Sequence, residues 1–143
     1  MRSKTEFKIS VIDAQGGGIG KQLVAALKQT LPEAQIVAAG TNSAATSAML
    51  KAGADGAATG ENAVVVGCRT ADVIVGPIGI AIADSMLGEV TPKMALAVAQ
   101  SRATRILIPF NHCDNIIVGI CELNMGMLIQ GAVNEIQKIA ERA

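Results

Sequence analysis

The sequence predicts an α/β fold: a doubly wound, mainly parallel sheet of five or six strands, arranged as a Rossmann-like three-layer sandwich. Two observations lead to this class. Short runs of branched apolar residues alternate with longer amphipathic segments along nearly all of the 143 residues. The apolar residues are aliphatic, with no Trp, no Tyr and two Phe, which suits helices packed closely onto a parallel sheet. We expect one domain over residues 1–143.

Three strand–helix pairs are expected in the first half of the chain. Each strand is a short apolar run that a polar residue or a glycine stops, and the helices carry apolar residues three or four positions apart. Pro32 ends the first helix, Asn42 or Thr41 caps the second, and Thr59 caps the third. The expected elements are strands 8–13, 35–39 and 54–58, helices 19–31 and 43–52, and a helix from 60 to 67 or 69.

The second half of the chain continues this alternation. Residues 72–76 (DVIVG) form the clearest strand. The pair Thr91-Pro92 is a strong helix start, because Thr caps helices and Pro suits the first helical position. Residues 79–90 have no assignment from the sequence. The remaining expected elements are a helix from 91 to 101, a strand over 105–109, a further strand over 116–120 that would make six, and a final helix over 123–142.

Composition and charge exclude several classes of function. The chain has 12 basic and 12 acidic residues and no aromatic platform for stacking bases, so we expect no nucleic-acid partner. Its longest apolar stretch, 73–83, is interrupted by glycines and a proline and is too short for a bilayer, so we expect no membrane. Three cysteines without a C-x-x-C pair, beside a single His, indicate a reduced, cytoplasmic protein without a metal site. Charged residues make up only 17%, which favours a homo-oligomer that covers apolar surface.

The glycine-rich turn after the first strand is the strongest functional signal. Residues 14–20 (AQGGGIG) join the carboxyl end of a buried strand to the start of a helix, where open α/β sheets bind ligands. Glycines let a ligand approach the backbone, and the helix N-terminus offers unpaired N–H groups to an anion. We therefore expect a small phosphate-bearing ligand: a nucleotide, or a dinucleotide such as NAD(P). The alternative is that the glycines only make a tight crossover from strand to helix.

The residues expected to contact this ligand lie in the turn and after two other strands. They are Gln15, Gly16, Gly17, Gly18, Ile19 and Gly20 in the turn, Thr41, Asn42 and Ser43 after the second strand, and Gly76 and Pro77 after the fourth. A dinucleotide-binding protein usually places an acidic residue after its second strand to bind the ribose hydroxyls. Residues 41–43 (TNS) stand there instead. They would bond a 2′-phosphate or a different sugar, or they simply cap a helix.

Three residues near the same edge are candidates for acid–base chemistry. His112 is the only histidine, Glu61 lies at the start of the third helix, and Asp13 ends the first strand. As an alternative to a binding module, they would serve a small enzyme with a site shared between subunits. Glu61 also has an ordinary role at a helix N-terminus, and Asp13 as an acceptor for the amides of the turn. A third alternative is a structural or interaction protein without a ligand.

Segment 14–21 (AQGGGIGK) resembles the phosphate-binding turns of two families. It is similar to the deviant phosphate loop of partition and nitrogenase-iron ATPases. Gln22 replaces the hydroxyl residue that holds Mg²⁺ there, and Gln15 replaces the signature Lys, which argues against ATP hydrolysis. The segment also resembles the turn of short-chain dehydrogenases, whose last three residues match 18–20 (GIG). Those enzymes require a Tyr and this chain has none, so hydride transfer of that type is excluded.

The whole chain resembles a bacterial family that is defined only as a domain of unknown function. The segments that carry the resemblance are VIDAQGGGIGK (11–21), GTNSAATSAMLKAGADGAATGENAVVV (40–66), ADVIVGPIGI (71–80) and SMLGEVTPKMA (85–95). The resemblance extends over nearly the whole chain. It implies no established activity, only a small bacterial protein of the cytosol.

Overall fold

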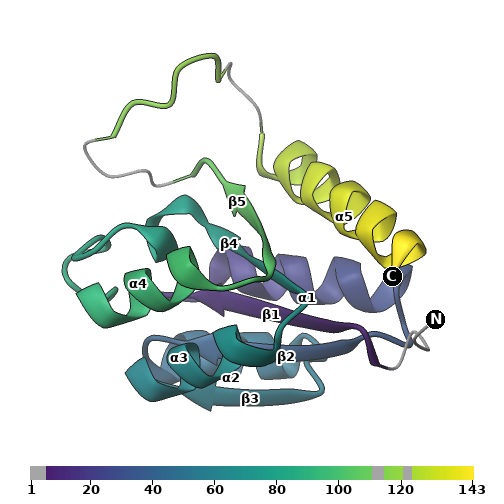
Figure 1. Cartoon of the computed structure of the whole chain (residues 1–143), viewed down its shortest axis with the longest axis horizontal. Coiled ribbons are helices and arrows are strands. Elements are labelled where there is room, and N and C mark those ends of the chain that lie inside the picture. The colour runs from purple at the N-terminus through teal and green to yellow at the C-terminus, as the bar shows by residue number, and fades with distance from the viewer. Residues whose placement is uncertain (1–5, 111–114, 121–123) are drawn as a thin grey trace.

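The computed structural model describes residues 6–110, 115–120 and 124–143 and confirms the doubly wound α/β fold (Figure 1). Within those residues, the sheet has five parallel strands in the order β3-β2-β1-β4-β5. The strands are β1 (Lys8–Asp13), β2 (Gln35–Gly40), β3 (Gly56–Thr59), β4 (Val73–Pro77) and β5 (Thr104–Ile108). The helices are α1 (Gly18–Thr30), α2 (Ser43–Lys51), α3 (Glu61–Thr70), the short 3₁₀ helix η2 (Ile78–Ala81), α4 (Pro92–Gln100) and α5 (Met125–Arg142).

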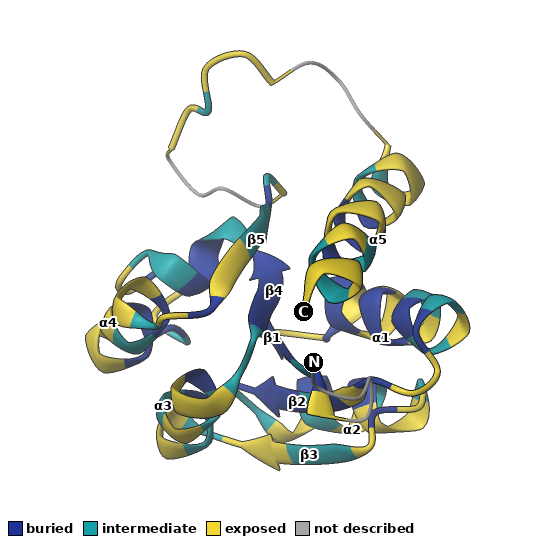
Figure 2. Cartoon of the chain, turned by 45° about the vertical axis from the view of Figure 1, so that its right-hand side comes forward, coloured by how far each residue is buried: buried dark blue, intermediate teal, exposed yellow. Residues whose placement is uncertain are grey.

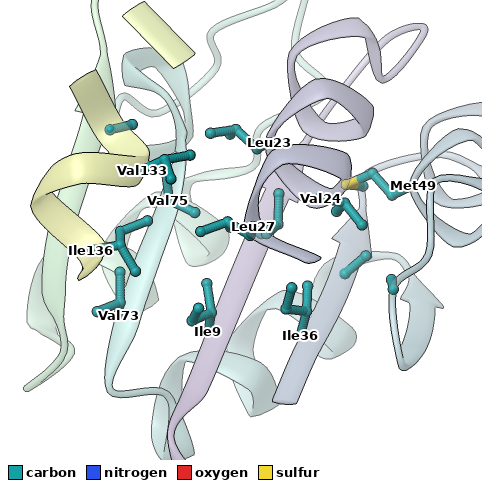
Figure 3. Packing of buried hydrophobic residues seen from close by; sticks show 14 of the residues in the cluster. Ile9, Leu23, Val24, Leu27, Ile36, Met49, Val73, Val75, Val133 and Ile136 are labelled. Atoms are coloured by element: carbon teal, nitrogen blue, oxygen red, sulfur yellow. The ribbon is translucent and has the colours of Figure 1, made fainter. Parts of the chain in front are cut away.

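Helices cover both faces of the sheet, which makes the three layers that the sequence predicts. One buried cluster joins α1, α2 and α5 to the first face, through side chains such as Leu23, Leu27 and Ile136 (Figure 3). A second cluster joins α3 and α4 to the other face, through Val64 and Val98 among others. Figure 2 shows the central strands buried between these layers. Among the described residues, no helix combines the length and the apolar character that a membrane span requires.

The winding of the chain changes direction at β1. β1 pairs with β2 on one side, where Asp13 lies opposite Gly40, and with β4 on the other, where Val11 lies opposite Val75. β2 and β3 therefore lie on one side of β1, and β4 and β5 lie on the other side. In open parallel sheets the connections that follow the two strands at such a switch point run to opposite faces of the sheet and leave a crevice between them. The glycine turn follows β1 directly and stands at this crevice.

The structure corrects two local predictions and confirms two others. Residues 116–120 form no strand: they lie in the connection between β5 and α5, away from the sheet, and 93% of Val118 is exposed (Figures 1 and 2). β propensity has little effect where no neighbouring strand or layer covers the side chains. Thr59 does not cap α3, because Gly60 precedes that helix and the Thr59 hydroxyl bonds the Thr46 hydroxyl at 2.7 Å. The predicted caps Asn42 and Thr91 are both confirmed.

The segment that the sequence leaves unassigned folds as η2 followed by a series of turns. We call residues 82–91 the strap. Three non-glycine residues of the strap, Asp84, Met86 and Leu87, have left-handed backbones with φ of 65°, 55° and 58°. Such conformations are unfavourable for L-residues and persist only where the surroundings enforce them. Met86 and Val90 are buried, which fixes the strap to the body of the protein.

Gly76, a predicted ligand contact, lies buried inside β4, where the backbone of β1 leaves no room for a side chain. A Cβ at this position would collide with the carbonyl oxygen of Ile12. We therefore expect Gly76→Ala to lower the free energy of unfolding by about 3 kcal/mol, measured by urea denaturation.

Gly131→Ala is the matched control for this substitution. Gly131 lies in α5, is exposed, and would have no neighbouring atom within 4 Å of an added Cβ. Because Ala is the better helix former, we expect this variant to be more stable than the wild type by about 0.5–1 kcal/mol. A Gly76→Ala protein as stable as the wild type would contradict the close approach of β1 and β4.

Candidate functional site

A cavity of about 430 Å³ opens at the carboxyl ends of β1 and β4, at the switch point of the sheet. Its wall is made by the glycine turn, the end of β4, the strap, and the chain on either side of the β5–α5 connection. The lining residues are Asp13, Ala14, Gln15, Gly16, Gly17, Gly18, Ile19, Gln22, Pro77, Met86, Phe110 and Met125. The structure thus brings Pro77 and the predicted turn residues from Gln15 to Ile19 together at one cavity, whose lining does not include Gly20. This is the position at which open α/β sheets bind ligands.

The glycines of the turn serve two different purposes. Gly17 has φ of 73°, and a Cβ there would lie 2.9 Å from the backbone of α2. A Cβ at Gly20 would lie 2.6 Å from the Sδ atom of Met49. Gly16 and Gly18 are exposed, have no left-handed backbone, and would have nothing within 4 Å of a Cβ. Packing of α1 against its neighbours therefore explains Gly17 and Gly20, but it does not explain Gly16 and Gly18.

Asp13 holds the turn in place from the end of β1. Its side chain is buried, and its Oδ1 and Oδ2 atoms accept hydrogen bonds from the N–H groups of Ala14 at 2.8 Å and Gly20 at 2.7 Å. Burial raises the pKa of Asp13 above its ordinary value; the bonds from the turn lower it, and the nearby Glu89 carboxylate raises it further. Asp13 thus takes the role of acceptor for the turn, which was the simpler of its two predicted roles.

Two N–H groups at the start of α1 stay open to a ligand. The N–H of Gly17 donates to the carbonyl oxygen of Ala14 at 3.0 Å, and that of Gly20 donates to Asp13. The N–H groups of Gly16 and Gly18 donate no hydrogen bond to any described residue. Both residues line the cavity, which the positive end of α1 also borders. The turn can therefore offer two backbone donors to an anion.

The cavity lining carries no cation among the described residues. Of the described residues that line it, only Asp13 is ionisable. Gln22, which replaces the magnesium-binding hydroxyl of the similar ATPases, donates its side-chain amide to the carbonyl oxygen of Gly18 at 3.1 Å. In place of a cation, the described lining offers an anion backbone N–H groups, the side-chain amides of Gln15 and Gln22, and the dipole of α1.

Glu89 is a residue at this edge that the sequence patterns did not indicate. The strap places it beside the turn, where its Oε1 atom accepts a hydrogen bond from the N–H of Gln15 at 2.8 Å. The same oxygen accepts hydrogen bonds from the hydroxyl of Thr41 and the amide of Asn42, both at 2.7 Å. Partial burial raises the pKa of Glu89, but these three hydrogen bonds outweigh it and leave the pKa below its ordinary value. The one signal for Glu89 in the sequence was an acidic residue within a segment that has neither helical nor strand periodicity.

Several of the predicted residues that the structure describes do not line the cavity: Gly20, Thr41, Asn42, Ser43, Glu61 and Gly76. Glu61 begins α3 and accepts a hydrogen bond from the hydroxyl of Thr91 at 2.6 Å, so it anchors the end of the strap. Ser43 is the exposed first residue of α2. His112 lies outside the described residues. In the part of the chain that the structure describes, no three His, Cys, Asp or Glu side chains gather in a way that could hold a metal ion.

The fold and this site define a doubly wound α/β protein with a cavity at its switch point, bordered by a glycine turn. The chain belongs to the family described as a domain of unknown function, DUF3842, which matches residues 8–141. This confirms the resemblance found in the sequence, and the match includes all five strands. No curated protein matches the chain. Function must therefore be argued from the geometry of the site.

Glu89 is expected to hold the strap against the turn mainly while it is ionised. Its pKa is lowered from the ordinary value of 4.5, so the stability it contributes is present above pH 4.5 and is lost as the pH falls through the pKa of the folded state. We expect Glu89→Gln to melt a few degrees below the wild type at neutral pH. The difference should shrink as the pH falls below 4.5, which melting curves followed by circular dichroism will measure.

Asp84→Asn is the matched control, because it removes one negative charge from the same strap. The Asp84 side chain is exposed, and Asn tolerates the left-handed backbone at this position. We expect its melting temperature to follow that of the wild type over the whole pH range. A Glu89→Gln difference that stays constant with pH would contradict a charge-dependent attachment of the strap.

Proposed function

We propose that this protein binds a nucleotide or dinucleotide with one or two phosphates, and that a phosphate lies against the N–H groups of Gly16 and Gly18. The observation that carries the proposal is the pair of glycines itself. At both positions there is room for a side chain and the backbone is not left-handed, so the fold does not require glycine. A bare backbone with unpaired N–H groups at a cavity wall is what a bound phosphate needs.

The size and the apolar part of the cavity support a nucleotide rather than a free phosphate ion. Its volume of about 430 Å³ lies within the range of small-molecule sites. Pro77, Met86, Phe110 and Met125 contribute apolar side chains to the wall. Methionine sulfur and aromatic rings make favourable contacts with flat rings. A ligand that joins a phosphate to a flat heterocycle matches both parts of the lining.

The charges around the turn favour a dinucleotide over a nucleoside triphosphate. ATPases with a phosphate loop neutralise the triphosphate with a Lys and with Mg²⁺ held by a hydroxyl. Here no described Lys or Arg lines the cavity, Gln22 bonds Gly18, and the Asp13 carboxylate lies next to the turn. Rossmann-type sites bind a pyrophosphate through backbone N–H groups and a helix N-terminus, which are the groups available here.

We also propose that the protein acts in the cytoplasm as a homo-oligomer, without nucleic acid or membrane as a partner. Support for the oligomer comes from large apolar side chains on the segments next to the cavity. Leu87 in the strap is 97% exposed, and Ile116 in the β5–α5 connection is 89% exposed. Side chains of this kind are commonly covered by another subunit.

The phosphate site is tested by thermal shifts with NAD, NADP, ATP, GTP, FAD and coenzyme A. We expect a dinucleotide to stabilise the wild type by about 2.7 kcal/mol at one hundred times its Kd, and ATP to stabilise it less. Gly18→Asp should abolish the shift, because its carboxylate would take the place of the phosphate. An Asp is favourable in the first turn of a helix, so this variant should fold.

Gly131→Asp is the control for that variant, because it places the same side chain on an exposed glycine of α5, away from the turn. It should respond to the ligands as the wild type does. The proposal fails if none of the six compounds raises the melting temperature, or if Gly18→Asp responds like the wild type.

A further inference from the structure

We infer that Glu89 is the ribose-binding acid of this site and that it selects a ligand whose ribose has free 2′- and 3′-hydroxyls over one with a 2′-phosphate. This inference rests on the proposed nucleotide-binding function. It sets aside one of the alternatives for Thr41, Asn42 and Ser43, the binding of a 2′-phosphate. It is based on the position of the Glu89 carboxylate, which the strap places beside the end of β2.

Glu89 lies at the edge of the site, outside the lining of the cavity, where its Oε1 atom meets the turn and the residues after β2. In doubly wound dinucleotide sites the acidic residue that binds the ribose stands just after the second strand, next to the glycine turn. Here the residues after β2 are Thr41 and Asn42, and the N–H of Thr41 is fixed to the carbonyl oxygen of Asp13 at 3.1 Å. The Oε1 atom of Glu89 contacts both side chains and the backbone of Gln15. A segment far along the chain thus supplies the carboxylate that the end of β2 lacks.

The carboxylate of Glu89 can still accept hydrogen bonds from a ligand. All three of its hydrogen bonds go to Oε1, and Oε2 accepts none from any described residue. Glu89 is also partly exposed. An ionised carboxylate is an acceptor only, with about two lone-pair sites on each oxygen. It can therefore accept hydrogen bonds from a pair of ribose hydroxyls, but it has nothing to donate to a phosphate.

The charges near Glu89 oppose a 2′-phosphate. The three groups that hold its Oε1 atom are neutral, and no ion pair among the described residues involves Glu89. Burial raises the pKa of the nearby Asp13, and the negative charge of Glu89 adds to this rise. NADP-binding sites usually place an Arg beside the 2′-phosphate. Two carboxylates without such an Arg repel that group and leave a diol as the favourable partner.

The strap is built to hold this carboxylate in one place. Its turns hold three non-glycine residues in left-handed conformations. A hydrogen bond of 2.7 Å from the N–H of Asp84 to the carbonyl oxygen of Val90 joins the two ends of these turns. Thr91 bonds Glu61 at the far end of the strap. Strained backbone of this kind is characteristic of segments that position functional groups. In this strap the group at the turn is Glu89.

The test compares two ligands that differ only in the 2′-phosphate, NAD and NADP, by isothermal titration calorimetry. On the wild type we expect NAD to bind about tenfold more tightly than NADP or better, a comparison that needs no variant. Glu89→Gln should weaken NAD binding about tenfold and leave NADP binding unchanged or improved, so that the preference disappears. Asp84→Asn should keep the wild-type preference. Circular dichroism spectra will show that both variants are folded.

The outcomes separate this inference from the proposed function. Equal affinities of the wild type for NAD and NADP would overturn the role of Glu89 and leave the phosphate site at Gly16 and Gly18 standing. A Glu89→Gln variant that binds NAD and NADP more tightly by the same factor would also overturn the inference. Such a result would mean that the Glu89 side chain blocks the site instead of binding the ribose. If neither ligand binds to the wild type, the inference fails, whereas the proposed function fails only if none of the six compounds tested above stabilises the protein.

Discussion

The structure of the site depends on one carboxylate, that of Asp13, which joins the end of β1 to the start of α1. It accepts hydrogen bonds from two N–H groups of the turn while its side chain is buried. A buried charge is tolerated only where hydrogen bonds compensate for the loss of water, so the turn and Asp13 must fold together. The close packing of Gly17 and Gly20 against neighbouring residues then sets how near α1 lies to β1 and α2. The other two glycines of the turn, Gly16 and Gly18, line the cavity and have no packing role.

The cavity lining combines backbone donors with the Asp13 carboxylate and has no described cation, and the Glu89 carboxylate lies beside the turn, outside this lining. Each of the two carboxylates is held by N–H or hydroxyl donors rather than by a positive side chain. Burial raises the pKa of Asp13, and the charge of Glu89 adds to this rise. This arrangement suits a ligand that brings modest negative charge at one end and hydroxyl donors at another. It is poorly suited to a highly charged ligand that needs Mg²⁺. The proposed function uses only recognition by hydrogen bonding.

Local sequence signals predicted most of the fold, because strands with branched aliphatic runs and helices with capped ends are specified by neighbouring residues. The prediction over 116–120 was wrong for the opposite reason: its β-branched residues favour a strand, but no strand lies beside them. The prediction that Thr59 caps α3 was wrong, because the Thr59 hydroxyl bonds the hydroxyl of Thr46 in α2 instead. Glu89 was missed because a series of turns with left-handed residues carries it, and no periodic pattern indicates such a path. His112 lies outside the described residues.

By itself the sequence determined the fold class, the family and the place of the cavity, since alternating elements and a glycine turn after a strand are local patterns. Only the tertiary structure divided the glycines into those that packing requires and those that it does not, because that distinction depends on contacts with α2. Only the tertiary structure brought Glu89 to Thr41 and Asn42, which lie 48 and 47 residues earlier in the chain. Such a meeting depends on how the strap folds over the sheet edge, and no short segment of the sequence encodes it.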